Sequence, residues 1–166
     1  TFAAISIGSA VTEMKIFEFT SRRVMKEVDW ISTRLGLGLD AYTMGWISSR
    51  NVEELCRVLR DFARIMDGYK VNAYRACATS AFRESRNMLI LVDYIEKQTG
   101  LTIEVLSNSE QRFIDYQSIA SVTTEFESII QNPAAIVDIG GSSMQVSLFD
   151  KDKLITTQNI RVGSIT

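Results

Sequence analysis

Apolar and polar residues alternate over the first third of the chain in a way that predicts β-strands. Residues 2–19 form two predicted strands around a tight turn at Gly8, Ser9 and Ala10, and residues 23–31 form a third. A period of two places neighbouring side chains on opposite faces of a sheet, so these strands are expected to be half-buried. The glycine-rich stretch that follows, residues 34–46, is predicted to be a connector.

From residue 48 onward the apolar spacing changes to that of a helix. Residues 48–69 open with serines and carry apolar side chains at intervals of three and four, at Val52, Leu55, Leu59, Phe62, Ala63 and Met66. This spacing predicts a long amphipathic helix. Further along the chain the pattern predicts a strand (70–79), a short helix ending near Arg83, a helix (84–100), a strand (101–107), a helix (108–126), a hairpin (134–149) and a strand from 153.

A strand meander followed by alternating helices and strands predicts an α/β fold. The hairpin at 134–149 repeats the plan of the one at 2–19, because each is a strand, a Gly/Ser turn and a second strand. The repeat predicts two similar lobes, with the first at residues 1–130 and the opening of the second at 131–166. Because the sequence stops in mid-element, just after the second unit begins, we expect the chain to be a fragment of a longer protein.

The two Gly/Ser turns are candidate phosphate-binding loops. Successive backbone N–H groups in such a turn form a concave site for anionic oxygens, and glycine lets the ligand approach closely. Gly8 and Ser9 supply this feature in the first turn, and Gly140, Gly141 and Ser142 supply it in the second. An ordinary hairpin turn is the alternative for either one.

Three charged residues elsewhere in these motifs are candidates for catalysis or for binding a metal or phosphate. Asp138 ends the strand before the second turn, where it can hold a divalent metal, directly or through water. Arg83 lies one turn after a strand that ends in Thr79, where a guanidinium can bind an anion. Glu110 lies in the first turn of a helix, where it either caps the helix or orients a water for attack on phosphorus.

Composition excludes several classes of function. With a net charge of −2, the chain has no overall positive potential that would attract duplex nucleic acid. No apolar run approaches the ~20 residues that a membrane span needs. The chain contains no histidine, so Ser–His triads and histidine metal sites are excluded within it. No signal peptide is evident at the start of the sequence, and a cytoplasmic location is expected.

In combination these motifs resemble one family, the exopolyphosphatase / guanosine pentaphosphate phosphohydrolase (Ppx/GppA) family of the actin-like ATPase superfamily. The matching stretches are "AISIGSAV", "RLGLGL", "ATSAFRESRN", "SNSEQR" and "DIGGSSMQ", which occur in the family's order along nearly the whole chain. The resemblance implies an actin-like, ribonuclease-H-type α/β lobe followed by the first hairpin of a second lobe.

The resemblance also implies an activity and a role for each candidate. Members of the family release a terminal phosphate from polyphosphate or guanosine pentaphosphate with magnesium. By position, Glu110 becomes the carboxylate that activates water, Arg83 and the two turns bind phosphate, and Asp138 helps to hold Mg²⁺. A homodimer of the complete protein is consistent with the family.

Several positions depart from the family pattern. Ser6 stands where the family has Asp, Ala10 where it has Asn, and Gln145 where it has the Glu that ends the second loop. Gln111 and Asn108 replace a Glu and a Gly. Because an amide neither acts as a base nor binds a hard cation strongly, metal affinity is expected to be reduced.

Three readings of the sequence remain open at this point. The first is an active but altered phosphohydrolase, since positioning and charge neutralisation dominate phosphoryl transfer. The second is a catalytically impaired relative that binds polyphosphate or a guanosine alarmone as a sensor, which the missing acids favour. The third is an actin-like fold retained for protein–protein contact.

Overall fold

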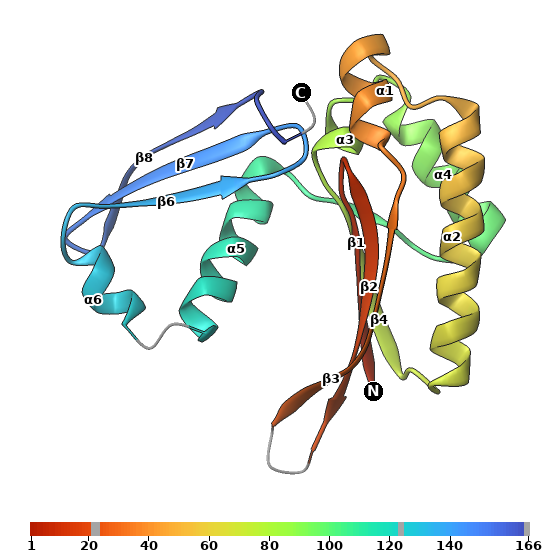
Figure 1. The fold of residues 1–166 in the computed structure, drawn as a ribbon, viewed down its shortest axis with the longest axis horizontal. Helices are drawn as coiled ribbons and strands as arrows, with labels where there is room; N and C mark the ends of the chain where they lie inside the picture. Colours follow the sequence, from red (N-terminus) through yellow and green to blue (C-terminus); the bar gives the residue numbers. More distant parts are fainter. Residues whose placement is uncertain (21–23, 123–124, 165–166) are drawn as a thin grey trace. The chain divides into compact units, whose positions relative to one another are not determined.

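A computed structural model describes residues 1–20, 24–122 and 125–164 of the chain (Figure 1). The chain divides into two compact units, Thr1–Val105 and Leu106–Thr166, which are described separately below. The predicted lobes, 1–130 and 131–166, concern the two-lobed plan of a longer protein and stay a prediction. Among the described residues, no helix has the length and apolarity that crossing a membrane requires.

The first unit is built on a five-stranded sheet in the order β3-β2-β1-β4-β5. The strands are β1 (Phe2–Ile7), β2 (Val11–Phe19), β3 (Met25–Arg34), β4 (Ala73–Ala78) and β5 (Glu104–Val105). The first three form the predicted antiparallel meander, and β4 runs parallel to β1. The predicted third strand began at Arg23, which lies outside the described residues. The α/β fold class predicted from the sequence is confirmed.

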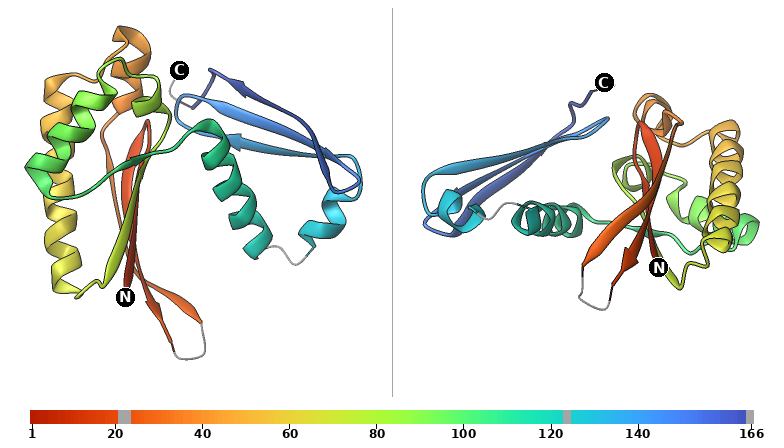
Figure 2. Two further views of the ribbon diagram at one scale, coloured as in Figure 1. Left: turned by 180° about the vertical axis from the view of Figure 1, so that it is seen from behind. Right: turned by 60° about the horizontal axis from the view of Figure 1, so that its bottom comes forward.

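Helices cover one face of this sheet (Figures 1 and 2). They are α1 (Leu37–Met44), α2 (Ser49–Gly68), α3 (Ser80–Arg83) and α4 (Met88–Thr99). The long helix α2 begins where predicted, because the Ser48 side chain accepts from the Asn51 N–H and Asp40 accepts from the Ser48 N–H at 2.9 Å. Helix α4 ends at Gly100, whose φ of 72° is the left-handed conformation that favours glycine.

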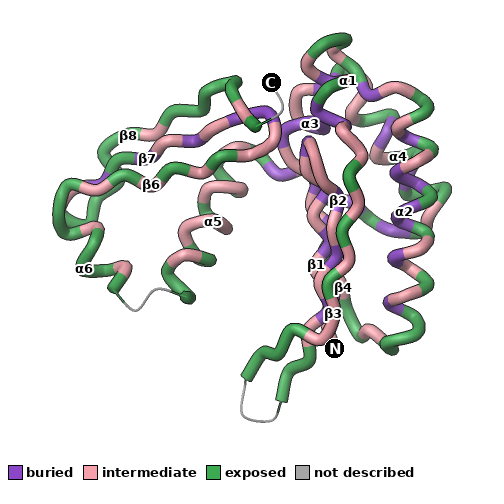
Figure 3. The backbone as a smooth tube through the Cα atoms, viewed as in Figure 1, coloured by how far each residue is buried: buried purple, intermediate pink, exposed green. Residues whose placement is uncertain are grey.

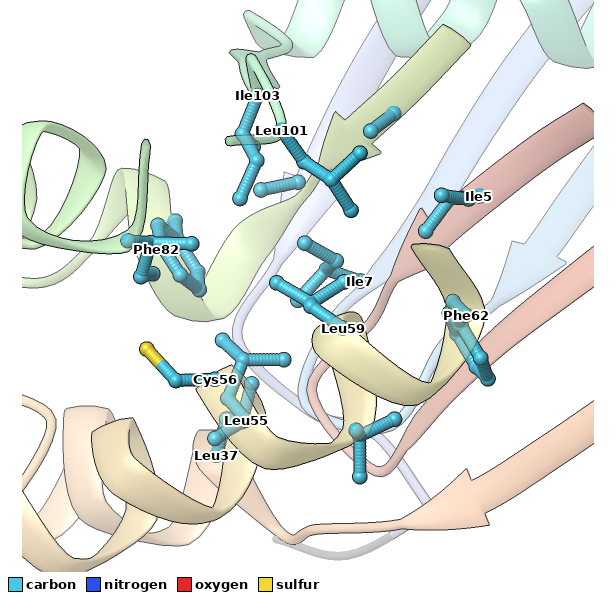
Figure 4. Close-up of a cluster of buried hydrophobic side chains, with 14 of the residues drawn as sticks. Ile5, Ile7, Leu37, Leu55, Cys56, Leu59, Phe62, Phe82, Leu101 and Ile103 are labelled. Atoms are coloured by element: carbon cyan, nitrogen blue, oxygen red, sulfur yellow. The ribbon is translucent and has the colours of Figure 1, made fainter. Parts of the chain in front are cut away.

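The core of the first unit lies between α2 and the sheet. Figure 4 shows Leu55, Leu59 and Phe62 of α2 among side chains that include Ile5 and Ile7 of β1. The alternation along β1 sorts its side chains strictly, since Ala3, Ile5 and Ile7 are buried and the residues between them are only partly covered. Figure 3 shows the same buried stripe along α2. The predicted apolar face of this helix is therefore confirmed.

Two connecting segments differ from the sequence prediction. The glycine-rich stretch 34–46 contains the helix α1, with Gly36 (φ 63°) before it and Gly45 (φ 79°) after it. These glycines bound the helix and do not interrupt it, and the spacing of the buried Leu37 and Ala41 is helical. The predicted strand 101–107 is reduced to β5, because its pairing with β4 is confined to two residues.

The second unit is a three-stranded antiparallel sheet with two helices. Its elements are α5 (Asn108–Val122), α6 (Phe126–Ile130), β6 (Ala134–Ile139), β7 (Met144–Asp150) and β8 (Lys153–Ile160). The strands follow one another in the order β6-β7-β8, so the meander that opens the first unit recurs here. The sequence predicted one helix over 108–126. The structure ends α5 at Val122, then has a separate α6, and residues 123–124 lie outside the described residues.

The interiors of the two units differ in polarity. The contiguous hydrophobic core lies entirely in the first unit. Among the described residues of the second unit, the buried side chains are mostly polar: Ser142, Ser143, Gln145 and Ser147, beside Leu106 and Phe149. Figure 3 shows buried segments along β7. Buried polar groups gathered in a turn and in the strand that follows it are unusual for a purely structural layer, because buried polar groups require partners.

Replacing Phe62 by alanine is expected to lower the free energy of unfolding by about 3–5 kcal/mol, because the ring is fully packed under the sheet and its loss leaves a cavity. Chemical denaturation would measure the loss. Leu89→Ala on α4 is the control, since Leu89 is 76% exposed and the expected change is below about 0.5 kcal/mol. Equal losses in the two variants would contradict this assignment of the core.

Candidate functional site

The two Gly/Ser turns have the same closed geometry. In the first, the Gly8 N–H donates to the Val11 carbonyl at 2.9 Å, and in the second the Gly140 N–H donates to the Ser143 carbonyl at 2.8 Å. Each turn thus joins its strands through two residues. A Cβ on Gly8 would lie 2.9 Å from the Val11 oxygen, a distance that real Cβ atoms do not show. Glycine at this position is required by the close approach of the backbone.

The turn geometry sets the strand register, and the register pairs the polar residues behind each turn. Ser6 lies opposite Glu13 in the first hairpin, and Asp138 lies opposite Gln145 in the second. Residues directly opposite each other in antiparallel strands share one face of the sheet. Each hairpin therefore holds one carboxylate beside one neutral polar side chain. The acid lies on the second strand of the first hairpin and on the first strand of the second hairpin.

In the first unit, the turn at Gly8 is joined to the start of α3. The Ser9 and Ser80 hydroxyl oxygens lie 2.8 Å apart and are buried, and the Thr79 N–H donates to the Ile7 carbonyl at 3.1 Å. These contacts arise because β1 and β4 are parallel, so that their carboxyl ends meet at one edge of the sheet. The structure therefore brings together two motifs that are 71 residues apart in the sequence.

Arg83 ends the four-residue helix α3, as predicted. Burial lowers the pKa of its guanidinium, an effect that the nearby Glu84 and Tyr42 oppose. Even so, arginine remains charged at neutral pH because its usual pKa is far above neutral. A partly buried cation attached to the segment that carries Ser80 is suited to an anion, and the predicted role of Arg83 in phosphate binding stays a prediction.

In the second unit, Glu110 caps the start of α5. Its Oε2 accepts from the Ser107 backbone N–H at 2.8 Å, while the Glu110 N–H donates to the Ser107 hydroxyl at 3.2 Å. This reciprocal pair is a capping box. The structural alternative raised for Glu110 is therefore realised, and its catalytic role remains a prediction. The carboxylate is exposed, so a ligand can also reach it.

The second turn is held by a residue that the sequence analysis did not single out. Gly163 lies so close to the turn that a Cβ on it would be 2.4 Å from the Ser142 nitrogen, and the Ser164 N–H donates to the Gly140 carbonyl at 3.1 Å. Ser142 is fully buried in this arrangement. The only sign in the sequence is a Gly–Ser pair shortly after a strand, which does not reveal the contact.

Helix α5 packs on the face of the sheet that carries Asp138 and Gln145. The Tyr116 and Phe149 rings meet edge to face with centroids 5.3 Å apart. One turn before Tyr116, Arg112 donates to the Thr157 hydroxyl at 3.3 Å. Phe149 and Thr157 lie on the same sheet face as Asp138, because they are an even number of positions away along the paired rows.

This interface contains a second residue that the sequence analysis missed, Asp115. It lies between Arg112 and Tyr116 on α5 and therefore on the side of the helix that meets the sheet. Burial, and next the charge of Asp138, raise the pKa of the Asp115 carboxyl from 3.8 to about 6. In the part of the chain that the structure describes, its buried Oδ2 has no hydrogen-bond partner, and neither does the Tyr116 hydroxyl or either amide atom of Gln145.

The predicted site residues thus fall into two groups. Gly8, Ser9 and Arg83 belong to the first unit together with Ser6 and Ala10, whereas Glu110 and the Asp138–Gln145 hairpin belong to the second. Within the first unit, Ser9 contacts Ser80, which belongs to the same short helix as Arg83. No cluster of three or more Asp, Glu, Cys or His side chains suited to a metal occurs among the described residues.

Gly8→Ala is expected to lower the free energy of unfolding by more than about 1 kcal/mol, because the added methyl group meets a backbone oxygen that cannot move without breaking the turn. Gly68→Ala at the end of α2 is the matched control. No atom lies within 4 Å of a Cβ there, so the variant should be neutral or slightly more stable. Urea denaturation would compare them, and an equally mild effect at Gly8 would contradict the close approach.

Asp115 predicts a specific pH dependence of stability. Because its pKa is raised in the folded state, its proton stabilises the fold below about pH 4, and this contribution is lost as the pH rises through about 6. Relative to Asp115→Asn, the wild type should lose about 1 kcal/mol between pH 4 and 7, after allowance for solvent screening of a half-exposed group. Unfolding measured in EDTA at both pH values tests this. A difference between the two proteins that does not change with pH would contradict it.

Comparison with known proteins identifies relatives of this arrangement. The chain is 22% identical to a bifunctional 3-dehydroquinate synthase/phosphatase of Fusobacterium nucleatum, over 98% of its own length and 25% of that protein. It is 23% identical to a guanosine-5'-triphosphate,3'-diphosphate pyrophosphatase of Pseudoalteromonas atlantica, over 99% of its length and 32% of that protein. The chain thus spans a quarter to a third of these curated relatives.

Solved structures share the fold. A Ppx/GppA protein of Aquifex aeolicus superposes with a TM-score of 0.78 at 22% identity, covering 98% of this chain and 52% of that one. An exopolyphosphatase of Cytophaga hutchinsonii gives 0.77 at 23% identity, with coverage of 98% and 50%. The model of the Ppx/GppA phosphatase family matches residues 22–166. The chain therefore belongs to the Ppx/GppA phosphatase family.

Proposed function

We propose that the protein is a phosphohydrolase that releases the terminal phosphate of inorganic polyphosphate or guanosine pentaphosphate. The observation that carries the proposal is the repeated hairpin. Two turns closed by a glycine N–H recur at equivalent register, each with a carboxylate on the strand behind it. Each turn by itself suits a phosphate group, because it offers backbone donors to anionic oxygens. Membership of the family supports the same reaction.

In this proposal the residues have distinct roles. The Gly8 and Gly140 N–H groups close their turns, so we assign phosphate contact to the residues that follow them, Ser9, Gly141 and Ser142. Because Ser9 and Ser142 are buried, phosphate would reach them only if the turns open. Arg83 neutralises phosphate charge, and Glu110 orients the attacking water. Phosphoryl transfer depends mainly on such positioning and on electrostatic stabilisation.

The donor set of the second hairpin fits a weakly held divalent cation. Asp138 offers a carboxylate and Gln145 an amide oxygen on one face, and Mg²⁺ is commonly held by one or two carboxylates together with water and substrate phosphate. Asp138 would hold the ion, directly or through water. When bound, Mg²⁺ supplies positive charge that offsets the charge of the phosphates. We propose that its affinity is reduced, because Gln145 is neutral.

A second candidate function is a sensor that binds polyphosphate or a guanosine alarmone without turning it over. Two observations favour it. Gln145 provides no carboxylate beside Asp138, and the Glu110 carboxylate is already used to cap α5. An amide at Gln145 can still hydrogen-bond a phosphate oxygen. Binding without hydrolysis is therefore the outcome expected if the remaining acids do not suffice.

The Glu110→Gln variant separates the two candidates. Gln keeps an oxygen that can accept from the Ser107 N–H but cannot act as a base, so the helix cap is retained. If Glu110 orients or deprotonates the water, magnesium-dependent phosphate release by the full protein should fall by ~10²–10⁴-fold, with substrate binding retained. Release would be measured with long-chain polyphosphate and with guanosine pentaphosphate, and the preferred substrate would identify the activity.

Ser107→Ala is the matched control, because it removes the hydroxyl that completes the cap and leaves the Glu110 carboxylate in place. This variant should lose about 0.5–2 kcal/mol of stability and little activity. If each of the two variants loses activity only to the extent that it loses stability, the role of Glu110 is structural. If the wild type binds polyphosphate but releases no phosphate, the sensor replaces the hydrolase.

A cytoplasmic location and a homodimer of the complete protein are also part of the proposal, and both rest on the family resemblance. The net charge of −2 supports the further expectation that duplex nucleic acid is not a ligand. Polyphosphate binding would depend on local donors at the turns, and not on a general basic surface.

A further inference from the structure

The interface between α5 and the three-stranded sheet contains polar atoms that the fold itself does not satisfy. Gln145 is 3% exposed, and neither its amide oxygen nor its amide nitrogen has a hydrogen-bond partner among the described residues. The buried Oδ2 of Asp115 is in the same state. Buried polar atoms without partners are costly, so each calls for a partner that the fold does not supply, such as a bound ion or an ordered water.

These groups converge on one place. Asp138 lies directly opposite Gln145 across β6 and β7, so both side chains project from the face on which α5 packs. Asp115 reaches this face from the helix, since Arg112 and Tyr116 on either side of it both contact the sheet. Two carboxylates and an amide oxygen thus approach from three separate elements.

The neighbouring cation does not neutralise this group. The Arg112 guanidinium donates to Thr157 at 3.3 Å and to Ser109 at 3.0 Å. No ion pair of Asp115 occurs within the described ranges of the chain. The two carboxylates therefore repel one another in a half-buried setting, and a bound cation would relieve that repulsion.

We propose that Asp115, Asp138 and the amide oxygen of Gln145 form a site for a hard divalent cation, Mg²⁺ or Mn²⁺. Carboxylate and amide oxygens are the donors that such ions prefer, and two carboxylates with water suffice for Mg²⁺. The new element is Asp115, which supplies a second carboxylate from the helix where β7 has only an amide. The inference rests on the proposed function in one respect, that the ion would serve the hydrolase.

The test measures binding of Mn²⁺ to the full protein. Electron paramagnetic resonance detects the Mn²⁺ that remains free. Asp115→Asn, which keeps the shape of the side chain, should weaken binding by about tenfold or more. Gln145→Glu should tighten it, because the substitution adds a carboxylate beside the other two. Asp93→Asn on α4 is the charge-matched control and should bind as the wild type does, since Asp93 is exposed and pairs with Lys97.

Folding is monitored separately by thermal unfolding in EDTA. Asp115→Asn should be at least as stable as the wild type there, because it removes an uncompensated buried charge, so weaker binding cannot be attributed to misfolding. Unchanged Mn²⁺ affinity in Asp115→Asn, or no binding by the wild type at millimolar Mn²⁺, would overturn the proposal. Loss of affinity in both Asp115→Asn and Asp93→Asn would also overturn it, as nonspecific attraction.

Phosphate release distinguishes this inference from the proposed function. Mn²⁺ binding that depends on Asp115, without hydrolysis of either substrate, would support the site and replace the hydrolase by the sensor. Hydrolysis whose metal dependence is the same in Asp115→Asn and the wild type would support the hydrolase and overturn the role of Asp115.

Discussion

The close approach of backbone to backbone in the two hairpin turns is the constraint on which the rest of the candidate site depends. A two-residue turn closed by a glycine N–H leaves one possible pairing of the strands behind it. That pairing places Ser6 opposite Glu13 and Asp138 opposite Gln145. A shift of one residue would turn every side chain to the other face of the sheet and would remove the acid from its partner. The chemistry of each hairpin is therefore set by its turn.

Much of the fold could be predicted from the sequence because it depends on local patterns. The period-two alternation of β1 and the helical spacing of α2 reflect burial on one face, and both were found where the pattern places them. Helix α1 was missed because glycine was interpreted as an interruption, whereas Gly36 and Gly45 adopt the left-handed conformation that bounds a helix. The residue types alone do not indicate whether a glycine precedes a helix, follows it or interrupts it.

The site was less accessible to sequence reasoning, because its parts meet through tertiary packing. The contact of Ser9 with Ser80 follows from the parallel pairing of β1 with β4, and the position of Asp115 follows from the packing of α5 on β7. From the sequence of a predicted helix alone, an acidic residue such as Asp115 is expected to face solvent. Gly163 was missed for the same reason, since nothing local to it indicates that it contacts the second turn. The capping role of Glu110 could be anticipated from the sequence, because it depends only on residues next to it in the chain.

The polar interior of the second unit has a consequence for its dynamics. Leu106 and Phe149 are the buried apolar side chains among the described residues of this unit, so residues 106–166 taken by themselves should open at a lower free energy than the first unit, and their backbone amides should exchange with solvent sooner. A ligand that binds only the closed form would then oppose opening in proportion to the logarithm of its concentration. A ligand bound at the buried polar residues would therefore make α5 and β7 more ordered. The same residues would then both bind the ligand and respond to it.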